Sequence, residues 1–385
     1  MITIAYFWFM KVIVLGAGLV GAPMALDLAK GSEFEVTVAD ISRKNLDKFK
    51  ADNIATLEMD LDNEAALMEV LKSHDLVLNA VPGFMGYRTT ERILRAGKNV
   101  VDISFFPEDA LELDGLAKEH DVTAIVDCGV APGMSNILPG YVDSILDKTD
   151  SILIYVGGLP KVRELPYEYK AVFSPIDVIE EYTRPARYIE NGKLVTKPAL
   201  SEPELLHFDK VGTLETFNSD GIRSLSKTMP HIPNIKEKTL RYPGHIRLME
   251  IMREAGFFSS EPTEVNGVKI RPIDLTAKLL FPQWELKPGE VDYTIMRIEV
   301  AGEHNGKKVR HTYTLFDEYC PETKVHSMAR TTGYTATMAV RMLAKGLYNE
   351  KGIVVPEFIG KNHECVKFIL DGLADRGVKY ELQID

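Results

Sequence analysis

The chain has 385 residues, 45% of them hydrophobic, and a formal net charge of -11 at pH 7. Its length suffices for two domains with buried cores, whereas the negative charge argues against nucleic acid as a partner, because nucleic-acid surfaces concentrate Lys and Arg on one face. Its cysteines (Cys128, Cys320 and Cys365) are far apart and show no metal-ligand or disulfide spacing, so we expect no metal and a reducing, cytoplasmic location. The expected partner is therefore a small molecule.

The opening stretch MITIAYFWFM is apolar but lacks a basic start and a cleavage site, and it is too short to cross a bilayer. We interpret it as an N-terminal extension, and the alternative is that Met10 is the natural first residue. No other apolar run is long enough for a membrane helix, so no membrane partner is expected.

Short runs rich in β-branched residues alternate with helical patterns between positions 11 and 127. The strand-like runs are KVIVL, EVTVAD, ATLEMD, DLVLNAVP, NVVDIS and TAIVDCG. Strands separated by helices form βαβ units, which build a parallel sheet with helices on both faces. The pattern predicts an α/β fold in which residues 1–135 form a Rossmann doubly wound, dinucleotide-binding domain.

The rhythm changes after Asn136, where the strand-like runs become longer and alternate apolar with polar residues. Two such runs within 291–319 are joined by HNG at residues 304–306, a hairpin signal. We predict a second, substrate-binding α+β domain over residues 136–333 with a mainly antiparallel sheet. Residues 334–385 then show two helical patterns on either side of an extended GIVVPEF.

A glycine motif, GAGLVG, directly follows the first strand and opens a helix. In this context Gly16 permits a tight turn, Gly18 lets the backbone approach a pyrophosphate, and Gly21 allows close packing of helix and strand. The helix N-terminus favours the anionic phosphates. Together with the intervening Leu19 and Val20, these residues are the predicted binding site for a dinucleotide cofactor.

Asp40 ends the second strand about twenty residues after the motif, where a carboxylate binds both ribose hydroxyls and repels a 2′-phosphate. It favours NAD as the cofactor, while Arg43 leaves NADP open, because an arginine accommodates that phosphate. The carboxyl ends of parallel strands meet at one edge of the sheet. Further cofactor contacts are therefore predicted at Asp60, Leu61, Asn79, Ala80, Val81, Pro82 and Gly129.

The stretch DCGVAPGMSN, residues 127–136, occupies the equivalent place on a later strand. Cys128 has no basic sequence neighbour that would activate a thiol, so we interpret it as a pocket-wall residue that contacts substrate. Asp127 is either a proton acceptor or a cap for the following turn, and the residues alone leave both open. Gly129 and Gly133 let the backbone pass close to the ligands.

Polar side chains also gather in three loop-like stretches of the middle region, and the candidates there are Lys170, Asn218, Arg223, Arg241 and His245. Arginine suits bidentate carboxylate binding, which favours Arg223 and Arg241 as substrate ligands, with Asn218 and Lys170 beside them, and the alternative for either arginine is a surface or structural role. His245 is a candidate general base near neutral pH, and a purely structural, hydrogen-bonded histidine is the alternative.

Several motifs together resemble one family. GAGLVG, YEYKAVFSP, TFNSDGIRSL, TLRYPGH and GIVVPEF resemble the saccharopine dehydrogenase (reductase-type) superfamily over nearly the full length. Within it, CGVAPGMSN, VGGLP, TFNSDGIRSL and TLRYPGH resemble the L-lysine 6-dehydrogenase branch. Saccharopine reductases resemble one another in a GLDPG-type segment, where this chain has GVAPG with Ala131 in place of the Asp. The resemblance therefore implies a substrate without the glutamate part of saccharopine.

The resemblance also implies that residues 334–385 return, as C-terminal helices, to complete the nucleotide-binding domain. The middle sheet is implied to help form a homodimer or a larger homo-oligomer. The implied reaction is NAD-dependent oxidation of L-lysine at its ε-carbon. Hydride leaves C6, hydrolysis releases ammonia, and the resulting 2-aminoadipate 6-semialdehyde cyclises to 1-piperideine-6-carboxylate.

Hydride leaves only from a neutral amine, and the ε-amine of free lysine titrates near ~10.4. An alkaline optimum or a nearby base is therefore expected, and the candidates are His245, Asp127 and Glu108. Arg223, with Arg241 as second choice, is expected to hold the α-carboxylate. The alternatives are saccharopine oxidation or reduction, a related imine reductase acting on polyamine precursors, and a non-catalytic NAD-binding regulator.

Overall fold

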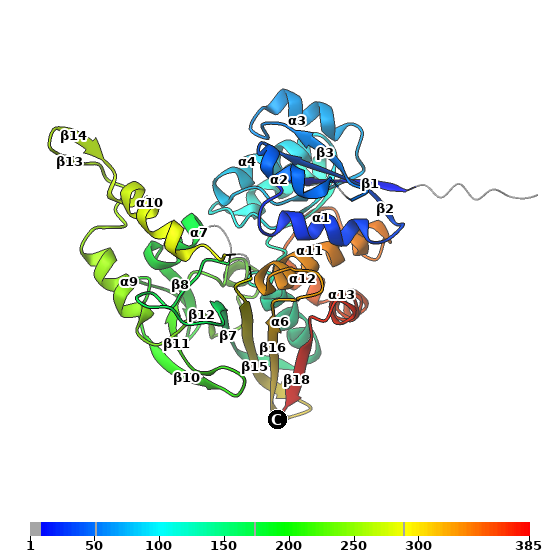
Figure 1. Ribbon diagram of the computed structural model, residues 1–385. Coiled ribbons are helices and arrows are strands. Elements are labelled where there is room, and N and C mark those ends of the chain that lie inside the picture. The colour runs from blue at the N-terminus through cyan, green and yellow to red at the C-terminus, as the bar shows by residue number, and fades with distance from the viewer. Residues whose placement is uncertain (1–8, 51, 173–174, 288) are drawn as a thin grey trace, which may run out of the picture.

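The chain folds into two lobes, each built on its own sheet (Figure 1). The computed structural model describes residues 9–50, 52–172, 175–287 and 289–385. The first eight residues of the apolar opening stretch lie outside these ranges, so its interpretation as an extension stays a prediction. Met10 is inside them and begins the first strand.

The upper lobe in Figure 1 contains a seven-stranded sheet with the order β17-β6-β5-β4-β1-β2-β3. The strands are β1 (Met10–Leu15), β2 (Phe34–Asp40), β3 (Ala55–Glu58), β4 (Leu76–Asn79), β5 (Asn99–Asp102), β6 (Thr123–Ile125) and β17 (Gly352–Val354). All the pairs are parallel, and the order reverses between β1 and β4. The predicted Rossmann doubly wound sheet is confirmed, and the chain order places a ligand crevice at that reversal.

Alternation along β1 explains why helices cover both faces of this sheet. Val12 and Val14 pack in one cluster with side chains of α1 (Gly21–Ala29) and of α11 (Ser327–Ala344). Ile13 and Leu15 pack in another cluster, because successive strand residues face opposite sides. The helices of this second layer are α3 (Glu64–Leu71), α4 (Gly83–Arg95) and α5 (Asp114–Glu119), and the shorter helices nearby are α2 (Arg43–Leu46), η1 (Asp47–Phe49) and η2 (Ala110–Leu113).

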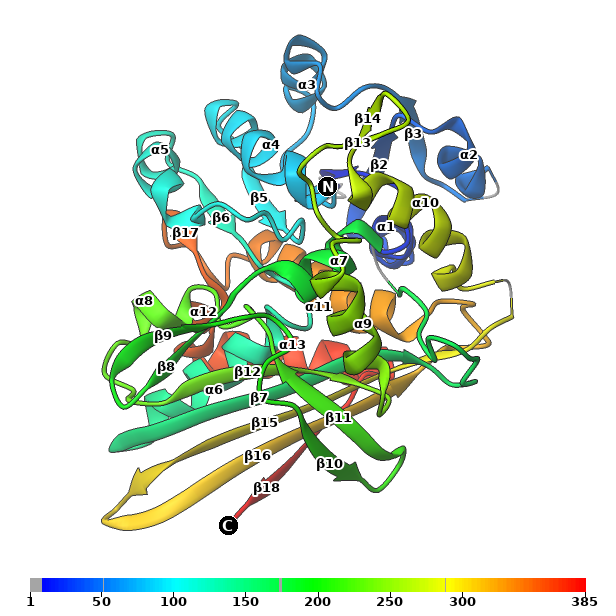
Figure 2. The same cartoon turned by 90° about the vertical axis from the view of Figure 1, so that its left-hand side faces the viewer.

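The lower lobe contains a nine-stranded sheet whose main path is β10-β11-β12-β7-β15-β16-β18. Its strands are β7 (Lys148–Pro160), β8 (Ala186–Glu190), β9 (Lys193–Lys197), β10 (Glu204–Phe208), β11 (Gly212–Asn218), β12 (Ile235–Arg241), β15 (Asp292–His304), β16 (Lys307–Glu318) and β18 (Tyr380–Ile384). Figure 2 shows β7, β15 and β16 running side by side across the lobe. The pairs are antiparallel except that β12 runs parallel to β7, so the mainly antiparallel sheet is confirmed.

The turn between β15 and β16 is Asn305-Gly306, with positive φ values of 51° and 72°. Positive φ at both central residues is the geometry of a tight two-residue hairpin, and Asn and Gly tolerate it. The hairpin predicted from the sequence is therefore present.

The remaining helices cover the lower sheet or join the lobes. They are α6 (Met134–Ile145), α7 (Pro175–Thr183), α8 (Leu225–Thr228), α9 (His245–Glu254), α10 (Pro272–Trp284), α12 (Pro356–Gly360) and α13 (His363–Asp375), and a small hairpin is formed by β13 (Thr263–Val265) and β14 (Val268–Ile270). The hairpin projects from the body beside α10 (Figure 1). The C-terminal segment supplies two strands in addition to the expected helices: β17 joins the parallel sheet, while β18 extends the lower sheet beside β16.

Candidate active site

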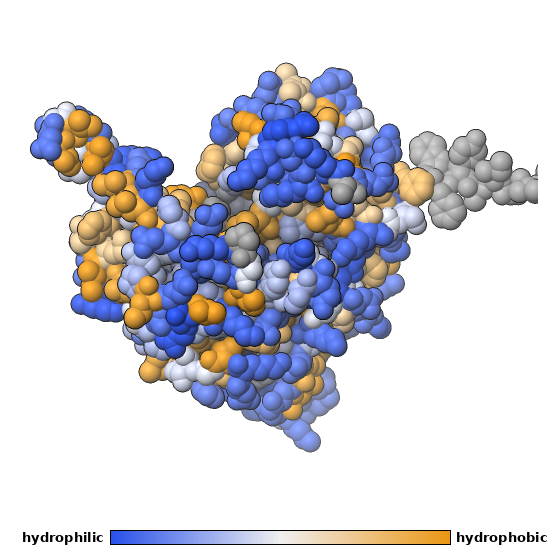
Figure 3. Space-filling model, in the orientation of Figure 1, coloured by the Kyte–Doolittle hydropathy of each residue, from blue (hydrophilic) through white to orange (hydrophobic). Residues whose placement is uncertain are grey.

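A cavity of about 710 Å³ lies between the two lobes and is lined by residues from both. The space-filling view shows the surface hollowed between the upper lobe and the side that carries α10 (Figure 3). The cavity opens at the carboxyl ends of the parallel strands, where ligands bind in sheets of this type. Its two ends differ in chemistry and are considered in turn.

The end against the parallel sheet is formed by the residues predicted to hold a dinucleotide. The lining includes Gly16, Gly18, Leu19, Val20, Gly21, Asp40, Asp60, Leu61, Ala80, Val81, Pro82 and Gly129. Asn79 does not line the cavity. It is fully buried beneath it and donates a hydrogen bond from Nδ2 to Asp102 at 2.6 Å.

The glycine turn fits a dinucleotide by three separate features. A Cβ at Gly21 would lie 2.1 Å from the Gly16 carbonyl oxygen, and Gly16 has φ +99°, so both positions need glycine. A Cβ at Gly18 would meet nothing within 4 Å, so backbone there faces open space. The N-cap of α1, Val20, makes no side-chain cap bond, which leaves helix N–H groups available to phosphate oxygens.

Asp40 accepts backbone hydrogen bonds from Ala17 at 2.7 Å and from Ser42 at 2.6 Å, so its carboxylate is fixed at the cavity rim. Arg43 forms ion pairs with Asp47 at 3.2 Å and Glu58 at 3.6 Å. An arginine held by two carboxylates is partly neutralised before any phosphate arrives. The geometry therefore retains the expected anionic group at the ribose position.

Two acidic side chains lie beneath the middle of the cavity. Burial raises the pKa of Asp102 to about 7, against hydrogen bonds from Ser104 that lower it. Asp127 lines the cavity in a left-handed conformation with φ 52°. Its two carboxylate oxygens accept hydrogen bonds from Nε and Nη2 of Arg223, each at 2.9 Å. Arg223 also donates a hydrogen bond to the Phe106 carbonyl at 2.9 Å.

That pairing changes the expected role of Arg223. The guanidinium is not part of the cavity lining and is committed to Asp127, with only 6% of each side chain exposed. A buried bidentate pair of this kind positions backbone and carboxylate rather than a ligand. The geometry thus supports a structural role for Arg223 in place of the predicted carboxylate ligand.

The cavity end against the lower lobe carries mostly acidic groups. The lining there includes Asp177, Glu180, Glu181, Asp220 and Glu237, with Asp127 at the boundary between the two ends, together with the guanidinium groups of Arg184 and Arg241. Arg184 pairs with Glu180, and Arg241 donates to Glu181 at 2.5 Å. The lining is therefore richer in carboxylates than in guanidinium groups.

Arg241 is held on all three guanidinium nitrogens. Besides Glu181 it donates to the Tyr182 hydroxyl at 3.1 Å and to the Leu240 carbonyl at 2.9 Å. His245 lies behind it, outside the cavity lining, with its ring nitrogens bonded to Tyr182 and to the Tyr167 carbonyl. Burial and the Arg241 charge lower the pKa of His245 to about 3, so the structure supports the structural alternative for this histidine.

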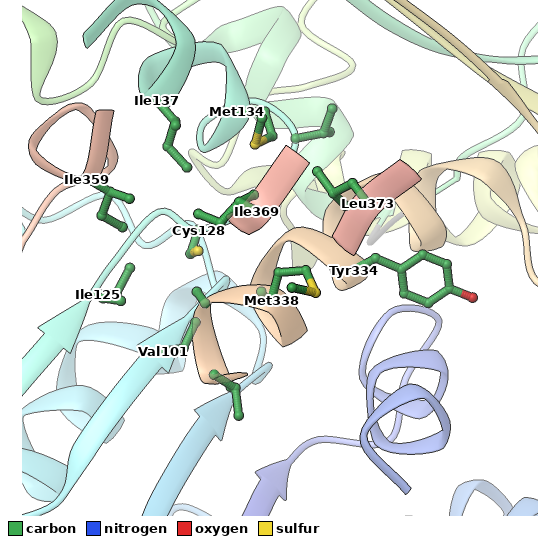
Figure 4. Close-up of a cluster of buried hydrophobic side chains, with 14 of the residues drawn as sticks. Val101, Ile125, Cys128, Met134, Ile137, Tyr334, Met338, Ile359, Ile369 and Leu373 are labelled. Atoms are coloured by element: carbon green, nitrogen blue, oxygen red, sulfur yellow. The ribbon is translucent and has the colours of Figure 1, made fainter. Parts of the chain in front are cut away.

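The other predicted site residues lie elsewhere. Cys128 is fully buried in the hydrophobic cluster shown in Figure 4, among Val101, Ile125 and Met134, and burial raises the pKa of its thiol. The prediction that it is a pocket wall is corrected, because the side chain at position 128 points into the core while Asp127 and Gly129 face the cavity.

Three further candidates also stand outside the cavity lining. Glu108 is exposed at the surface. Lys170 pairs with Glu164 at 3.3 Å and Glu290 at 3.7 Å. Asn218 donates to Ser201 at 3.2 Å. These contacts assign them structural or surface positions that residue type alone did not reveal.

Two cavity groups were missed in the sequence, although both had a periodic signal. Glu237 and Thr239 alternate along β12 with Arg241, which the sequence did single out, and the three share the face that lines the cavity. A second polar stripe also lines the cavity with helical spacing. It is formed by Asp177, Glu180 and Glu181 on α7 and by Arg184, the residue after the helix. Neither signal is visible unless the cavity side of each element is known.

Among the described residues no cluster of His, Cys, Asp and Glu is arranged to hold a metal ion. The parts of the chain that the structure describes also contain no helix long and apolar enough to span a bilayer.

The parallel sheet, the glycine turn and the facing cavity define a two-domain protein that binds a pyridine nucleotide. Residues 12–125 match the saccharopine dehydrogenase NADP binding domain, and residues 129–378 match the saccharopine dehydrogenase C-terminal domain. The chain therefore belongs to the saccharopine dehydrogenase family, as the sequence resemblance predicted.

Curated relatives extend this similarity at low identity. The chain is 22% identical to the mitochondrial alpha-aminoadipic semialdehyde synthase of Bos taurus over 97% of its own length, but it spans only about half, 48%, of that protein. It is 22% identical to a saccharopine dehydrogenase [NADP(+), L-glutamate-forming] of Schizosaccharomyces pombe, with 97% and 99% of the two chains covered. The structure resembles apo saccharopine dehydrogenase (L-Glu forming) of Saccharomyces cerevisiae with TM-score 0.79 and 20% identity, covering 98% and 100% of the chains.

Proposed function

We propose that the protein is an NAD-dependent oxidoreductase that removes the ε-amine of L-lysine. The product would be 2-aminoadipate 6-semialdehyde, which cyclises to 1-piperideine-6-carboxylate, with ammonia and NADH released. One observation carries the proposal: the cavity end opposite the cofactor site is lined mainly by carboxylates, and its arginines already pair with glutamates. Such a lining favours a cationic amine as substrate.

Saccharopine would place the two additional carboxylates of its glutamate part among these groups. Like charges at close range cost several kcal/mol unless cations compensate for them. Arg241 has its three guanidinium nitrogens engaged by other groups. Of the two arginines in the lining, this leaves Arg184, which pairs with Glu180 one turn earlier in the chain, as the partner for a single substrate carboxylate. The lining thus suits one carboxylate and one ammonium better than three carboxylates.

In this proposal one end of the cavity would bind the nucleotide and the other end would bind the amino-acid substrate. The glycine turn, Asp40 and the strand ends would hold the nucleotide, whose nicotinamide supplies the hydride acceptor. We favour NAD because Asp40 places a fixed carboxylate where a 2′-phosphate would bind, although the relatives are named as NADP enzymes. Arg184 would hold the α-carboxylate, and the acidic wall would receive the ammonium.

Saccharopine dehydrogenase activity is the second candidate, and it is favoured by the relatives that are named saccharopine dehydrogenases. A non-catalytic regulator would use the nucleotide site alone and would leave the charged far end of the cavity without a ligand.

We also propose that the protein forms a homo-oligomer in the cytoplasm. The exposed Val265, Val268, Leu275 and Leu279 on and beside the projecting hairpin offer apolar surface for such association.

The proposal is tested by following reduced-nucleotide formation with NAD or NADP and each of lysine, saccharopine, ornithine and a diamine. Lysine with NAD is expected to give the highest kcat/KM, with ammonia released in equal amount to NADH. Turnover of saccharopine without turnover of lysine would overturn the proposal in favour of the second candidate. Preference for NADP would correct the cofactor alone.

A further inference from the structure

Glu237 on β12 lines the cavity, and only 5% of the residue is exposed. Its Oε1 accepts one long hydrogen bond, 3.4 Å, from the Ser219 hydroxyl. Its Oε2 has no hydrogen-bond partner among the described residues. Buried polar atoms are normally paired, so an unpaired carboxylate oxygen beside a cavity indicates a partner that a ligand supplies.

The backbone around Glu237 makes room for this carboxylate. A Cβ at Gly221 would lie 1.6 Å from Oε1, so no larger residue fits at position 221 while the side chain stays in place. Ser219, which donates to Glu237, itself accepts a hydrogen bond from the Thr239 hydroxyl at 2.9 Å. All three side chains line the cavity, so the hydroxyls form a short donor chain that ends on the carboxylate.

The charges that act on Glu237 come from α7 and from the loop that follows β11. Glu181 lies on α7, and Asp220 and the cationic Arg223 lie in the loop after β11. Burial, reinforced by Glu181 and Asp220, raises the pKa of Glu237 to about 8, while Ser219 and Arg223 oppose the shift. Within the described chain Glu237 forms no ion pair of its own.

Four other carboxylates of the same wall already form ion pairs with arginines. Their guanidinium partners are Arg223 for Asp127, Arg184 for Glu180, Arg241 for Glu181 and Arg187 for Asp220. A cationic ligand gains most at the one wall carboxylate that has an unpaired buried oxygen. Glu237 is therefore the strongest position for an incoming ammonium.

We infer that Glu237 is the catalytic residue that binds the substrate ε-ammonium and accepts its proton. This inference rests on the proposed function, because it assigns the base that amine oxidation requires. In the step, one N–H bond of the ammonium breaks, its electron pair stays on nitrogen, and the proton forms an O–H bond with Glu237 Oε2. The neutral amine would then lose hydride from its adjacent carbon to the oxidised nicotinamide nucleotide of the proposed function and become an iminium group, and the proton later leaves Glu237 for water in the cavity.

The pH profile of kcat/KM for lysine tests this assignment. A base that must be ionised and an ammonium that must be protonated give a profile that rises near pH 8 and falls near the ~10.4 of free lysine. In Glu237→Gln the rise near pH 8 should disappear, so that activity increases only toward the pKa of lysine itself. At pH 8 the variant should lose about 10²–10³-fold in kcat/KM.

Two further variants serve as a control for the loss of a carboxylate and as a separate test of the pKa of Glu237. Glu204→Gln removes a carboxylate of the same sheet that pairs with Lys238 and is exposed to solvent, and it should retain the wild-type profile. Ser219→Ala removes the hydrogen bond that lowers the pKa of Glu237, so the rise should move to higher pH while the maximum rate is largely kept. A Glu237→Gln profile that still rises near pH 8 would overturn the assignment.

Thermal unfolding without nucleotide or substrate gives a readout that does not depend on turnover. A folded-state pKa near 8, above the usual ~4.3 of Glu, means that the folded protein keeps a proton that the unfolded chain has lost between those values. Wild-type stability should therefore fall relative to Glu237→Gln as pH rises from 5 to 8 and level off above 8. A constant difference would show that Glu237 does not titrate there.

The outcomes separate the two proposals. If lysine is oxidised and Glu237→Gln behaves like Glu204→Gln in rate and profile, the assignment of Glu237 fails while the proposed function stands. If no amine is oxidised by the wild-type protein, the proposed function fails, and with it the role in catalysis, whatever the thermal data show.

Discussion

The cofactor end of the cavity is formed largely by glycine backbone and apolar side chains, whereas the opposite end is formed by ionisable side chains from several elements of the lower lobe. Glycines at fixed offsets can be recognised in sequence because the turn itself requires them. A charged wall has no such local requirement, since its members come together only after the two lobes have packed. The two ends therefore differ in how far they were predictable, and they should also respond differently to mutation.

The Asp127–Arg223 pair, at the boundary between the two ends, should give the largest effect on stability. Asp127→Ala leaves a guanidinium buried without its carboxylate, because only 6% of either side chain is exposed. The free energy of unfolding should fall by about 3–5 kcal/mol, measured by chemical denaturation. Asp127→Ala combined with Arg223→Met should recover part of that loss. As a control, Glu318→Ala breaks the exposed Lys161–Glu318 pair and should cost less than about 1 kcal/mol.

A loss in Asp127→Ala no larger than in Glu318→Ala would mean that the buried pair is solvated in solution. The Asp127–Arg223 pair would then not differ in role from the carboxylates that face the ligand. Arg223 would become available to a substrate carboxylate, as the sequence suggested.

The contrast also explains which sequence predictions succeeded. The βαβ rhythm and the Asn305-Gly306 hairpin follow from local chemistry, and the structure contains both. Cys128 and His245 were singled out by residue type, but burial decides their roles: one side chain points into the core and the other is bonded on both ring nitrogens. Glu237 was passed over because its importance arises from Glu181 and Gly221, which are distant in sequence.

Substitution of Gly18 directly tests the cavity end where the glycine turn is expected to bind the nucleotide. Gly18→Val adds a side chain where a Cβ meets nothing within 4 Å, so the fold should be kept while the new bulk blocks the approach of the pyrophosphate. Nucleotide affinity should fall about 100-fold, measured by titration of protein fluorescence with NADH. Gly115→Ala, also in open space but away from the cavity lining, is the matched control and should bind normally. Unchanged affinity in Gly18→Val would show that the nucleotide does not pass over this turn.

Substitution of Arg184 tests the cavity end that is formed by ionisable side chains, and we expect it to have the smallest effect of the three on the measured quantity. It lines the cavity, and its guanidinium lies 5.8 Å from the centroid of the Phe105 ring. Arg184→Gln should raise the lysine KM about 10-fold with kcat nearly unchanged, because a carboxylate contact far from the reacting carbon binds ground state and transition state alike. Arg271→Gln removes a similarly paired arginine outside the cavity and should leave both constants unchanged. A fall in kcat at constant KM would instead place Arg184 beside the reacting amine, which would reverse the orientation of lysine along the acidic wall.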